Sequence, residues 1–140
     1  MIRHDTLLLA GGTPENRNML RSVLDGRYHL LEAIGIQQAL LLMEQNSSCI
    51  AAVLLDMTDP ARLLTEGEDR TPLNALFQDV PVIALVEDDS QAALARAFDW
   101  GAADVIPLEY DQYAMLKRIE TIVELNLHKR NLPISSAGWW

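Results

Sequence analysis

One acidic residue, Asp56, stands at the end of an apolar segment, where the fold could bring a chemical group within reach of a ligand. Residues 50–55 are six consecutive apolar residues, a length and composition typical of a strand buried on both faces of a sheet. Ligands of open α/β sheets bind just beyond the carboxyl ends of such strands. Asp56 is therefore a candidate for ligand binding or covalent chemistry. Alternatively, its carboxylate ends the strand and bonds the loop that follows.

A second candidate site is the turn Gly11-Gly12-Thr13, which follows an apolar segment at residues 6–10. Thr13 suits the N-cap of a helix, and Pro14 suits its first position. The free N–H groups at a helix start can bind an anion. This turn lacks the spacing and the lysine of a phosphate-binding loop, however. The alternative is a tight strand-to-helix turn without a ligand.

The rest of the sequence offers few residues for catalysis. No serine, histidine and aspartate set and no cluster of metal ligands emerges, and the histidines are scattered at positions 4, 29 and 128. Cys49 is the one cysteine, so the chain has no intrachain disulfide. It adjoins the apolar segment and is expected to be a small core residue rather than a nucleophile. We therefore expect a protein that is not an enzyme.

Composition and charge narrow the classes of partner. A net charge of −9 on 140 residues argues against nucleic-acid binding, which depends on clustered lysine and arginine. The apolar runs are far shorter than the roughly 20 residues that a membrane-spanning helix needs. The first residues lack the pattern of a signal peptide. A cytoplasmic domain that binds neither membranes nor nucleic acids is expected, and a hydrophobic fraction of 49% is enough for a core.

Short apolar segments alternate with helical patterns along the chain. Strands are predicted at residues 6–10, 28–33, 50–56, 81–86 and 104–106. Five helices are predicted at residues 14–25, 37–45, 72–78, 87–100 and 111–130, and the longest loop at residues 59–71. This alternation predicts a doubly wound α/β fold, a five-stranded parallel sheet of flavodoxin-like order 2-1-3-4-5 with helices on both faces. Residues 1–130 are expected to form this domain, and residues 131–140 a tail or a linker to an output domain.

Over residues 5–128, several segments resemble in order and spacing the receiver domain of two-component response regulators, the CheY-like family. The segments are TPENR at 13–17, YHLLEA at 28–33, VLLD at 53–56 with Pro60 four residues later, PVIAL at 81–85 and AFDWGAAD at 97–104. The resemblance implies a flavodoxin-like fold and a place in phosphorelay signal transduction. In this family the aspartate that ends the third strand accepts a phosphoryl group, and Asp56 occupies that position.

The residues that assist phosphoryl transfer in the family are missing from their expected positions. The resemblance places Gly11 and Gly12 where an acidic pair holds Mg²⁺ together with the acceptor aspartate. It places Val86 where a threonine or serine contacts the phosphoryl oxygens, and Leu108 where a lysine does so. With Thr58, whose carbonyl could contribute a ligand, these residues define a degenerate pocket.

The loss of these groups leaves phosphoryl charge on Asp56 poorly compensated. Because Mg²⁺ prefers carboxylate ligands, we expect its binding to be weak or absent, unless Asp59 or Glu87 substitutes for the missing acids, and we expect no other cofactor. Arg96 could in principle supply a positive charge, but its position on a predicted helix is expected to place that charge away from Asp56. The pocket around Asp56 is expected to be more open than in other receivers, since two carboxylate side chains are missing.

Three functions are compatible with this pattern. The first is a degenerate receiver, or pseudo-receiver, that acts as a protein-interaction and dimerisation module without ordinary Mg²⁺-dependent phosphorylation. The second is a residual phospho-acceptor at Asp56. The third is a small-ligand or anion-binding regulatory domain at the Gly11-Gly12-Thr13 turn.

The partners of such a receiver are expected to be a partner protein, an output domain or a second copy of the chain. Receivers commonly pair through the fourth helix, the fifth strand and the fifth helix. The candidates on that face are Arg96, Trp100, Tyr113, Lys117 and Glu120. An aromatic residue such as Trp100 suits an interface anchor. The alternative for Trp100 is that it covers the edge of the sheet.

Overall fold

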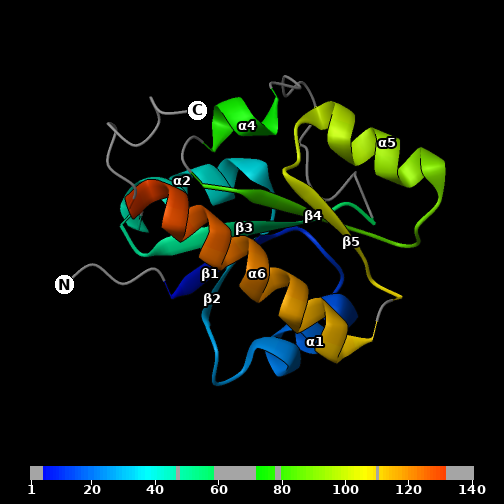
Figure 1. Ribbon diagram of the computed structural model, residues 1–140, viewed down its shortest axis with the longest axis horizontal. Coiled ribbons are helices and arrows are strands. Elements are labelled where there is room, and N and C mark those ends of the chain that lie inside the picture. The colour runs from blue at the N-terminus through cyan, green and yellow to red at the C-terminus, as the bar shows by residue number, and fades with distance from the viewer. Residues whose placement is uncertain (1–4, 47, 59–71, 78–79, 110, 132–140) are drawn as a thin grey trace.

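One parallel sheet organises the chain (Figure 1). The computed structural model describes residues 5–46, 48–58, 72–77, 80–109 and 111–131. Its strands are β1 (Thr6–Ala10), β2 (His29–Ala33), β3 (Ile50–Asp56), β4 (Val82–Val86) and β5 (Asp104–Pro107). Neighbouring strands pair in the order β2-β1-β3-β4-β5, and every pair is parallel. The predicted fold class and strand order are confirmed, with β3 as the central strand.

The helices in the described ranges are the predicted ones, with shifted ends. They are α1 (Pro14–Leu24), α2 (Ile36–Asn46), α4 (Leu73–Leu76), α5 (Gln91–Trp100) and α6 (Gln112–Asn131). α5 begins later than predicted because Ser90 is its N-cap, with the hydroxyl accepting from the N–H of Ala93 at 3.3 Å. The predicted loop at 59–71 lies outside the described residues, as do residues 132–140 of the tail predicted at 131–140, whereas Asn131 is the last residue of α6. Within the described ranges, none of the helices combines the length and the apolar character that crossing a membrane requires.

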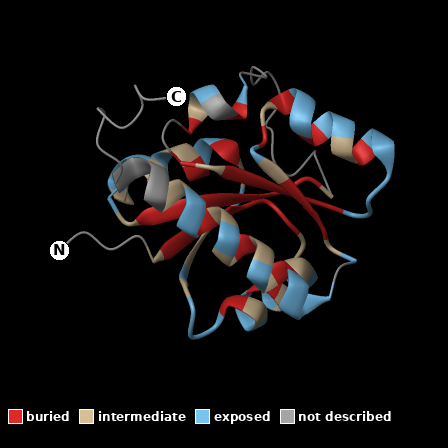
Figure 2. Cartoon of the chain, in the orientation of Figure 1, coloured by how far each residue is buried: buried red, intermediate tan, exposed pale blue. Residues whose placement is uncertain are grey.

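The helices cover both faces of the sheet and enclose two separate cores. On one face, α1 and α6 pack against alternate residues of β1 such as Leu7 and Leu9, and this core includes Leu20 of α1 and Met115 of α6. On the other face, the core combines residues of α2, α4 and α5 with the opposite side of the strands. All seven residues of β3 are buried, as the continuous red of the central strands shows (Figure 2). This burial explains the uninterrupted apolar run in the sequence.

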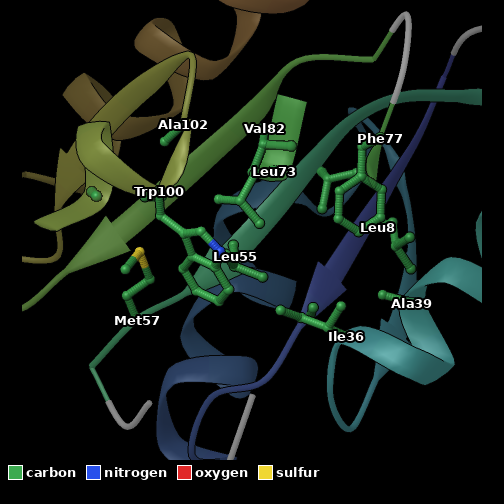
Figure 3. Close-up of a cluster of buried hydrophobic side chains, with 14 of the residues drawn as sticks. Leu8, Ile36, Ala39, Leu55, Met57, Leu73, Phe77, Val82, Trp100 and Ala102 are labelled. Carbon is green, nitrogen blue, oxygen red and sulfur yellow. The ribbon is translucent and has the colours of Figure 1, made fainter. Parts of the chain in front are cut away.

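Trp100, at the end of α5, belongs to the second core. It is 9% exposed, and its indole points into the cluster that contains Leu55 and Met57 (Figure 3). Gly101 then ends the helix in the left-handed conformation, with φ of 107°. Because so little of Trp100 reaches the surface, the structure favours the alternative that this side chain covers the sheet rather than anchors an interface.

Candidate functional site

Asp56 is the last residue of β3 and has no exposed surface. It pairs with Leu85 of β4, and the next residue, Met57, donates its N–H to the carbonyl of Leu85 at 2.8 Å. The strand therefore holds the carboxylate at the carboxyl end of the central strand, as predicted. Burial of an ionised carboxylate is unfavourable unless hydrogen bonds replace its water, so its partners decide what the site can do.

Both carboxylate oxygens of Asp56 accept hydrogen bonds from nearby side chains or backbone. Oδ1 accepts from the backbone N–H of Thr58 at 2.9 Å and from the Thr58 hydroxyl at 2.6 Å. Oδ2 accepts from Nδ2 of Asn16 at 3.0 Å, and the same nitrogen lies 3.4 Å from the Thr58 hydroxyl oxygen. Within the described residues, the donors to this carboxylate are therefore neutral groups.

Gly12 closes a further side of the carboxylate. Its φ is +93°, and a β-carbon at this position would lie 2.8 Å from Oδ2 of Asp56. Both the backbone conformation and the close approach therefore require glycine. The expectation of an unusually open pocket is wrong for the carboxylate itself. The Asp56 carboxylate itself occupies the space in which a side chain at position 12 would begin.

The turn that carries Gly12 is fixed by Arg17 of α1. The Arg17 side chain donates from Nε to the carbonyl of Gly11 at 3.1 Å and from an Nη to the carbonyl of Ala33 at 3.2 Å. The N–H of Gly11 also donates to the Ala33 carbonyl at 3.0 Å. These bonds tie the start of α1 to the ends of β1 and β2, which in turn holds the neighbouring Asn16 over the end of β3.

Asn16 and Arg17 were not predicted as site residues, although they lie within the segment that resembles receivers. Thr13 caps α1 by accepting from the backbone N–H of Asn16 at 3.1 Å, which makes Asn16 the third residue of the helix. In a capping box the side chain at this position turns back to the cap residue. Here it reaches across to β3 instead. The cap signal at Thr13 and Pro14 locates Asn16 in the first turn but does not identify its partner.

Two residues of the predicted pocket, Thr58 and Val86, line a hollow beside Asp56, and Thr58 also bonds the carboxylate. Thr58 and Val86 border a pocket of about 260 Å³, with Arg96 of α5 on its wall. Arg96 is not among the described hydrogen-bond donors to Asp56, so the expectation that its charge lies away from Asp56 stays a prediction. The acids Glu87 and Asp88 line the same pocket and oppose this positive charge. The pKa of Asp88 is lowered from its ordinary value because its carboxylate accepts hydrogen bonds from Ser90.

Leu108, the remaining residue of the predicted pocket, packs on the other face of the sheet. Its side chain lies against the core that α1 and α6 cover, and its backbone N–H donates to the carbonyl of Val86 at 2.7 Å. An apolar side chain at this position can take up core contacts, whereas a lysine would have to direct its ammonium group to solvent or to an anion. Leu108 therefore stabilises the fold and offers no charge to the site.

The described residues do not fit a magnesium ion at Asp56. Within the described ranges, no three histidine, cysteine, aspartate or glutamate residues lie close enough together to hold a metal. Asp59 lies outside those ranges, and Glu87 is exposed on the wall of the neighbouring pocket. The oxygens of Asp56 already accept hydrogen bonds, and the Gly12 backbone approaches Oδ2. A divalent ion here would lack the second carboxylate that such ions prefer.

The glycine turn is also poorly suited to an external anion. Gly12 faces the Asp56 carboxylate, whose charge repels a second anion. A shallow pocket of about 310 Å³ beside the turn is lined partly by Arg17 and Arg21. Arg17 already donates to two carbonyls, and Arg21 pairs with Glu32 at 2.7 Å, which raises the pKa of the Arg21 guanidinium. The tight strand-to-helix turn, the alternative left by the sequence, accounts for these contacts.

The interface candidates fall into different environments. Tyr113 is 67% exposed on α6, and the ammonium of Lys117 lies 5.5 Å from the centre of its ring. Lys117 also pairs with Glu120 at 3.7 Å, and Glu120 pairs with Arg27 at 3.2 Å. Tyr113 and Lys117 are therefore presented on the surface, whereas Glu120 is engaged within the molecule.

α5 presents two further side chains near this face. Arg96 is exposed, and Phe98, which was not predicted as an interface residue, is half exposed. α5 and α6 lie on opposite faces of the sheet with the edge strand β5 between them (Figure 1). The exposed candidates thus flank one edge of the sheet.

Comparison with known proteins bears on the fold. No family model and no curated protein matches the sequence. The structure is similar to the receiver domain of an HD domain-containing protein from Pseudomonas fluorescens, with a TM-score of 0.71, 18% identity and coverage of 90% of this chain and 99% of that one. It is also similar to a putative response regulator from Chloroflexus aurantiacus, with a TM-score of 0.69, 22% identity and coverage of 87% and 99%.

A third similar structure is that of a receiver-modulated diguanylate cyclase from Pelobacter carbinolicus, with a TM-score of 0.67, 20% identity and coverage of 91% of this chain and 99% of that one. These three structures are named as a signal receiver domain, a putative response regulator and a receiver-modulated enzyme. The chain has the receiver fold, and the aspartate that ends its central strand is buried.

Proposed function

We propose that this chain is a degenerate receiver, a protein-interaction module of two-component signal transduction that works without ordinary Mg²⁺-dependent phosphorylation. One observation carries the proposal: Asp56, at the acceptor position, is fully buried, and its described hydrogen-bond donors are Asn16 and Thr58. An acceptor oxygen must be reachable by a phosphodonor and free of other bonds at the moment of attack. Neither condition is met in this arrangement.

The missing charges support the same proposal. Phosphoryl transfer depends on positive groups that offset the charge of the transferring group and orient it. Near Asp56 the described residues supply two neutral side chains and a glycine backbone instead. Arg96 is a base close to Thr58, but Glu87 and Asp88 share its pocket. A phosphoryl group on Asp56 would therefore lack both a metal ion and an unopposed cation.

The surface at the β5 edge is the proposed site for partners. Exposed Tyr113, Arg96 and Phe98 are of the aromatic and arginine types that are enriched in protein interfaces, and Lys117 lies beside Tyr113. A second copy of the chain, an output domain or a partner protein would dock here. Receivers in two of the similar structures belong to proteins named for a diguanylate cyclase and for an HD domain. By analogy, we infer that this domain regulates another domain or protein through contact.

Phosphorylation by a small phosphodonor tests the proposal. The full chain is incubated with acetyl phosphate and Mg²⁺, and the intact mass is measured beside Asp56→Asn and beside a receiver whose acidic pair and lysine are present. We expect the reference receiver to gain a phosphoryl group and neither form of this chain to do so. A phosphoryl adduct on the wild type that Asp56→Asn lacks would instead establish Asp56 as a residual phospho-acceptor.

A further inference from the structure

The side chain of Asn16 has an unusual partner for a residue in the first turn of a helix. It reaches from α1 to Oδ2 of Asp56, 40 residues away in the sequence, at 3.0 Å. A carboxylate oxygen can only accept, so the amide must present its nitrogen to Asp56. The positive end of the amide dipole therefore lies against the one carboxylate oxygen that Thr58 does not bond. Asn16 is half-buried, whereas Asp56 is fully buried beneath it.

We propose that Asn16 is a positioning residue whose amide takes the place of a cation beside Asp56. The amide holds the carboxylate to α1 and closes Oδ2, in the same way that a metal ion would join an acidic residue of the first loop to the acceptor. This inference rests on the proposed function, because it explains how the site dispenses with a metal. Because the Asn16 side chain is neutral, the site carries only the negative charge of Asp56.

The charge of the site predicts how it should respond to a second carboxylate at position 16. The pocket holds one negative charge and three neutral hydrogen bonds. Asn16→Asp would place a second carboxylate at the same distance, with no donor left for Oδ2. Two carboxylates that close repel each other unless a proton or a cation lies between them. A pair of carboxylates is also the ligand set that a divalent ion prefers, so this variant should acquire a dependence on such an ion.

Exchanging the two side chains provides a matched variant with the wild-type charge. In Asn16→Asp combined with Asp56→Asn, the new amide at position 56 can accept from Thr58 through its oxygen and donate to the new carboxylate at position 16. Each of the three hydrogen bonds at position 56 then has a donor and an acceptor again, and only the long 3.4 Å contact between residue 16 and the Thr58 hydroxyl loses its donor. The exchange should recover most of the stability that Asn16→Asp loses, because residues in direct contact couple strongly.

The experiment follows thermal unfolding of the full chain in buffer with a chelator and then with millimolar Mg²⁺ or Mn²⁺. The control is Asn18→Asp, which makes the same charge change on α1, where the exposed Asn18 contacts Arg21 instead of Asp56. We expect Asn16→Asp to lower the melting temperature in chelator and to regain much of it with either ion. Wild type, Asn18→Asp and the exchanged double variant should not respond to the ions.

The outcomes separate this inference from the proposed function. Equal ion responses of Asn16→Asp and Asn18→Asp would overturn the role of Asn16, as would an exchanged variant no more stable than Asn16→Asp. A wild-type response to Mg²⁺ that Asp56→Asn abolishes would overturn the proposed function instead. If Asn16→Asp does not fold, Asn16→Ala replaces it: the loss it causes should be much smaller in an Asp56→Ala background, where Asn16 has no acceptor at position 56, and equal losses in both backgrounds would contradict the inference.

Discussion

Gly12 lies so close to Asp56 that a β-carbon at position 12 would be 2.8 Å from Oδ2 of Asp56. The turn that follows β1 therefore packs closely against the end of the central strand, β3. This contact gives the glycine a structural role that its position in the receiver pattern does not indicate. It also means that an acid at position 12 could not be restored without moving the turn or Asp56.

Substitution of Gly12 should therefore be more damaging than its backbone conformation alone implies. Gly12→Ala combines strain at positive φ, about 1–2 kcal/mol, with a steric overlap that costs about 1–3 kcal/mol. Gly26→Ala is the matched control, because Gly26 has φ of +78° and no atom within 4 Å of an added β-carbon. Urea unfolding should show the larger loss for Gly12→Ala. Equal losses would mean that Asp56 and the turn move apart easily.

Two substitutions of Asp56 should differ in their effect on stability. Asp56→Ala leaves the Asn16 amide and both Thr58 donors without an acceptor, a loss of about 1–3 kcal/mol for a buried polar group. Asp56→Asn keeps the shape, its oxygen can accept from Thr58, and Asn16 can turn its own amide oxygen to the new NH₂ group. We expect Asp56→Asn to stay close to wild type in the free energy of unfolding. A loss as large as that of Asp56→Ala would show that the negative charge itself is required.

Arg17 should contribute more to the fold than its neighbour on the same helix face. Arg17→Met removes two hydrogen bonds to carbonyls at the strand ends, an expected loss of about 1 kcal/mol. Arg21→Met, the control, removes an exposed ion pair with Glu32, and such pairs contribute little in water. Chemical denaturation compares the two variants. A smaller loss of stability for Arg17→Met than for Arg21→Met would contradict the prediction and would show that water replaces the Arg17 hydrogen bonds without penalty.

Tyr28 gives the molecule a sensitivity to alkaline pH. Its pKa is raised above the ordinary 10.0, chiefly by burial and then by the nearby acids Glu120 and Glu124. Because the folded pKa exceeds the unfolded one, this contribution to stability is complete below about pH 10 and is lost as the pH rises through the folded value. Ultraviolet absorbance titration of wild type against Tyr28→Phe should reveal one tyrosine that ionises late in the folded protein. Titration of that tyrosine at or below the value in the unfolded chain would contradict the prediction.

The surface at the β5 edge should mediate any self-association. Tyr113→Asp places a charge within an exposed aromatic and cationic patch, whereas Leu41→Asp changes an exposed apolar residue on α2, away from that edge. Light scattering on a concentration series measures the molar mass. We expect a concentration-dependent dimer that Tyr113→Asp weakens and Leu41→Asp does not. A dimer that both variants leave intact would place the interface elsewhere.

The sequence was sufficient to predict the fold because its signals are local. Helix starts and ends depend on residues next to them in the sequence. Examples are Thr13 and Pro14 at the start of α1 and Gly101 at the end of α5, and the apolar run that ends at Asp56 likewise marks β3. The parallel order then follows from alternating strands and helices. The observed helix ends differ from the predicted ones mainly where an N-cap residue sets the start of the helix, as Ser90 does for α5.

The site was less predictable because its contacts join distant segments. The bond from Asn16 to Asp56 depends on the rotation of α1 relative to β3, which Arg17 sets through the ends of β1 and β2. The placement of Arg96 beside Thr58 likewise depends on how α5 packs across the sheet. A missing side chain at Gly12 indicated an open pocket, whereas the Gly12 turn lies so close to Asp56 that an added β-carbon would be 2.8 Å from Oδ2, in keeping with close packing.

The most direct test of the account is an amide NMR titration of the full chain with Mg²⁺ followed by beryllofluoride, which mimics a phosphoryl group on an aspartate. The account predicts that the resonances of Gly12, Met57 and Thr58 stay unchanged, because Asp56 is buried and held by Asn16 and Thr58. Saturable shifts of these resonances in the wild type, absent in Asp56→Asn, would contradict it and would show that the aspartate accepts phosphoryl groups.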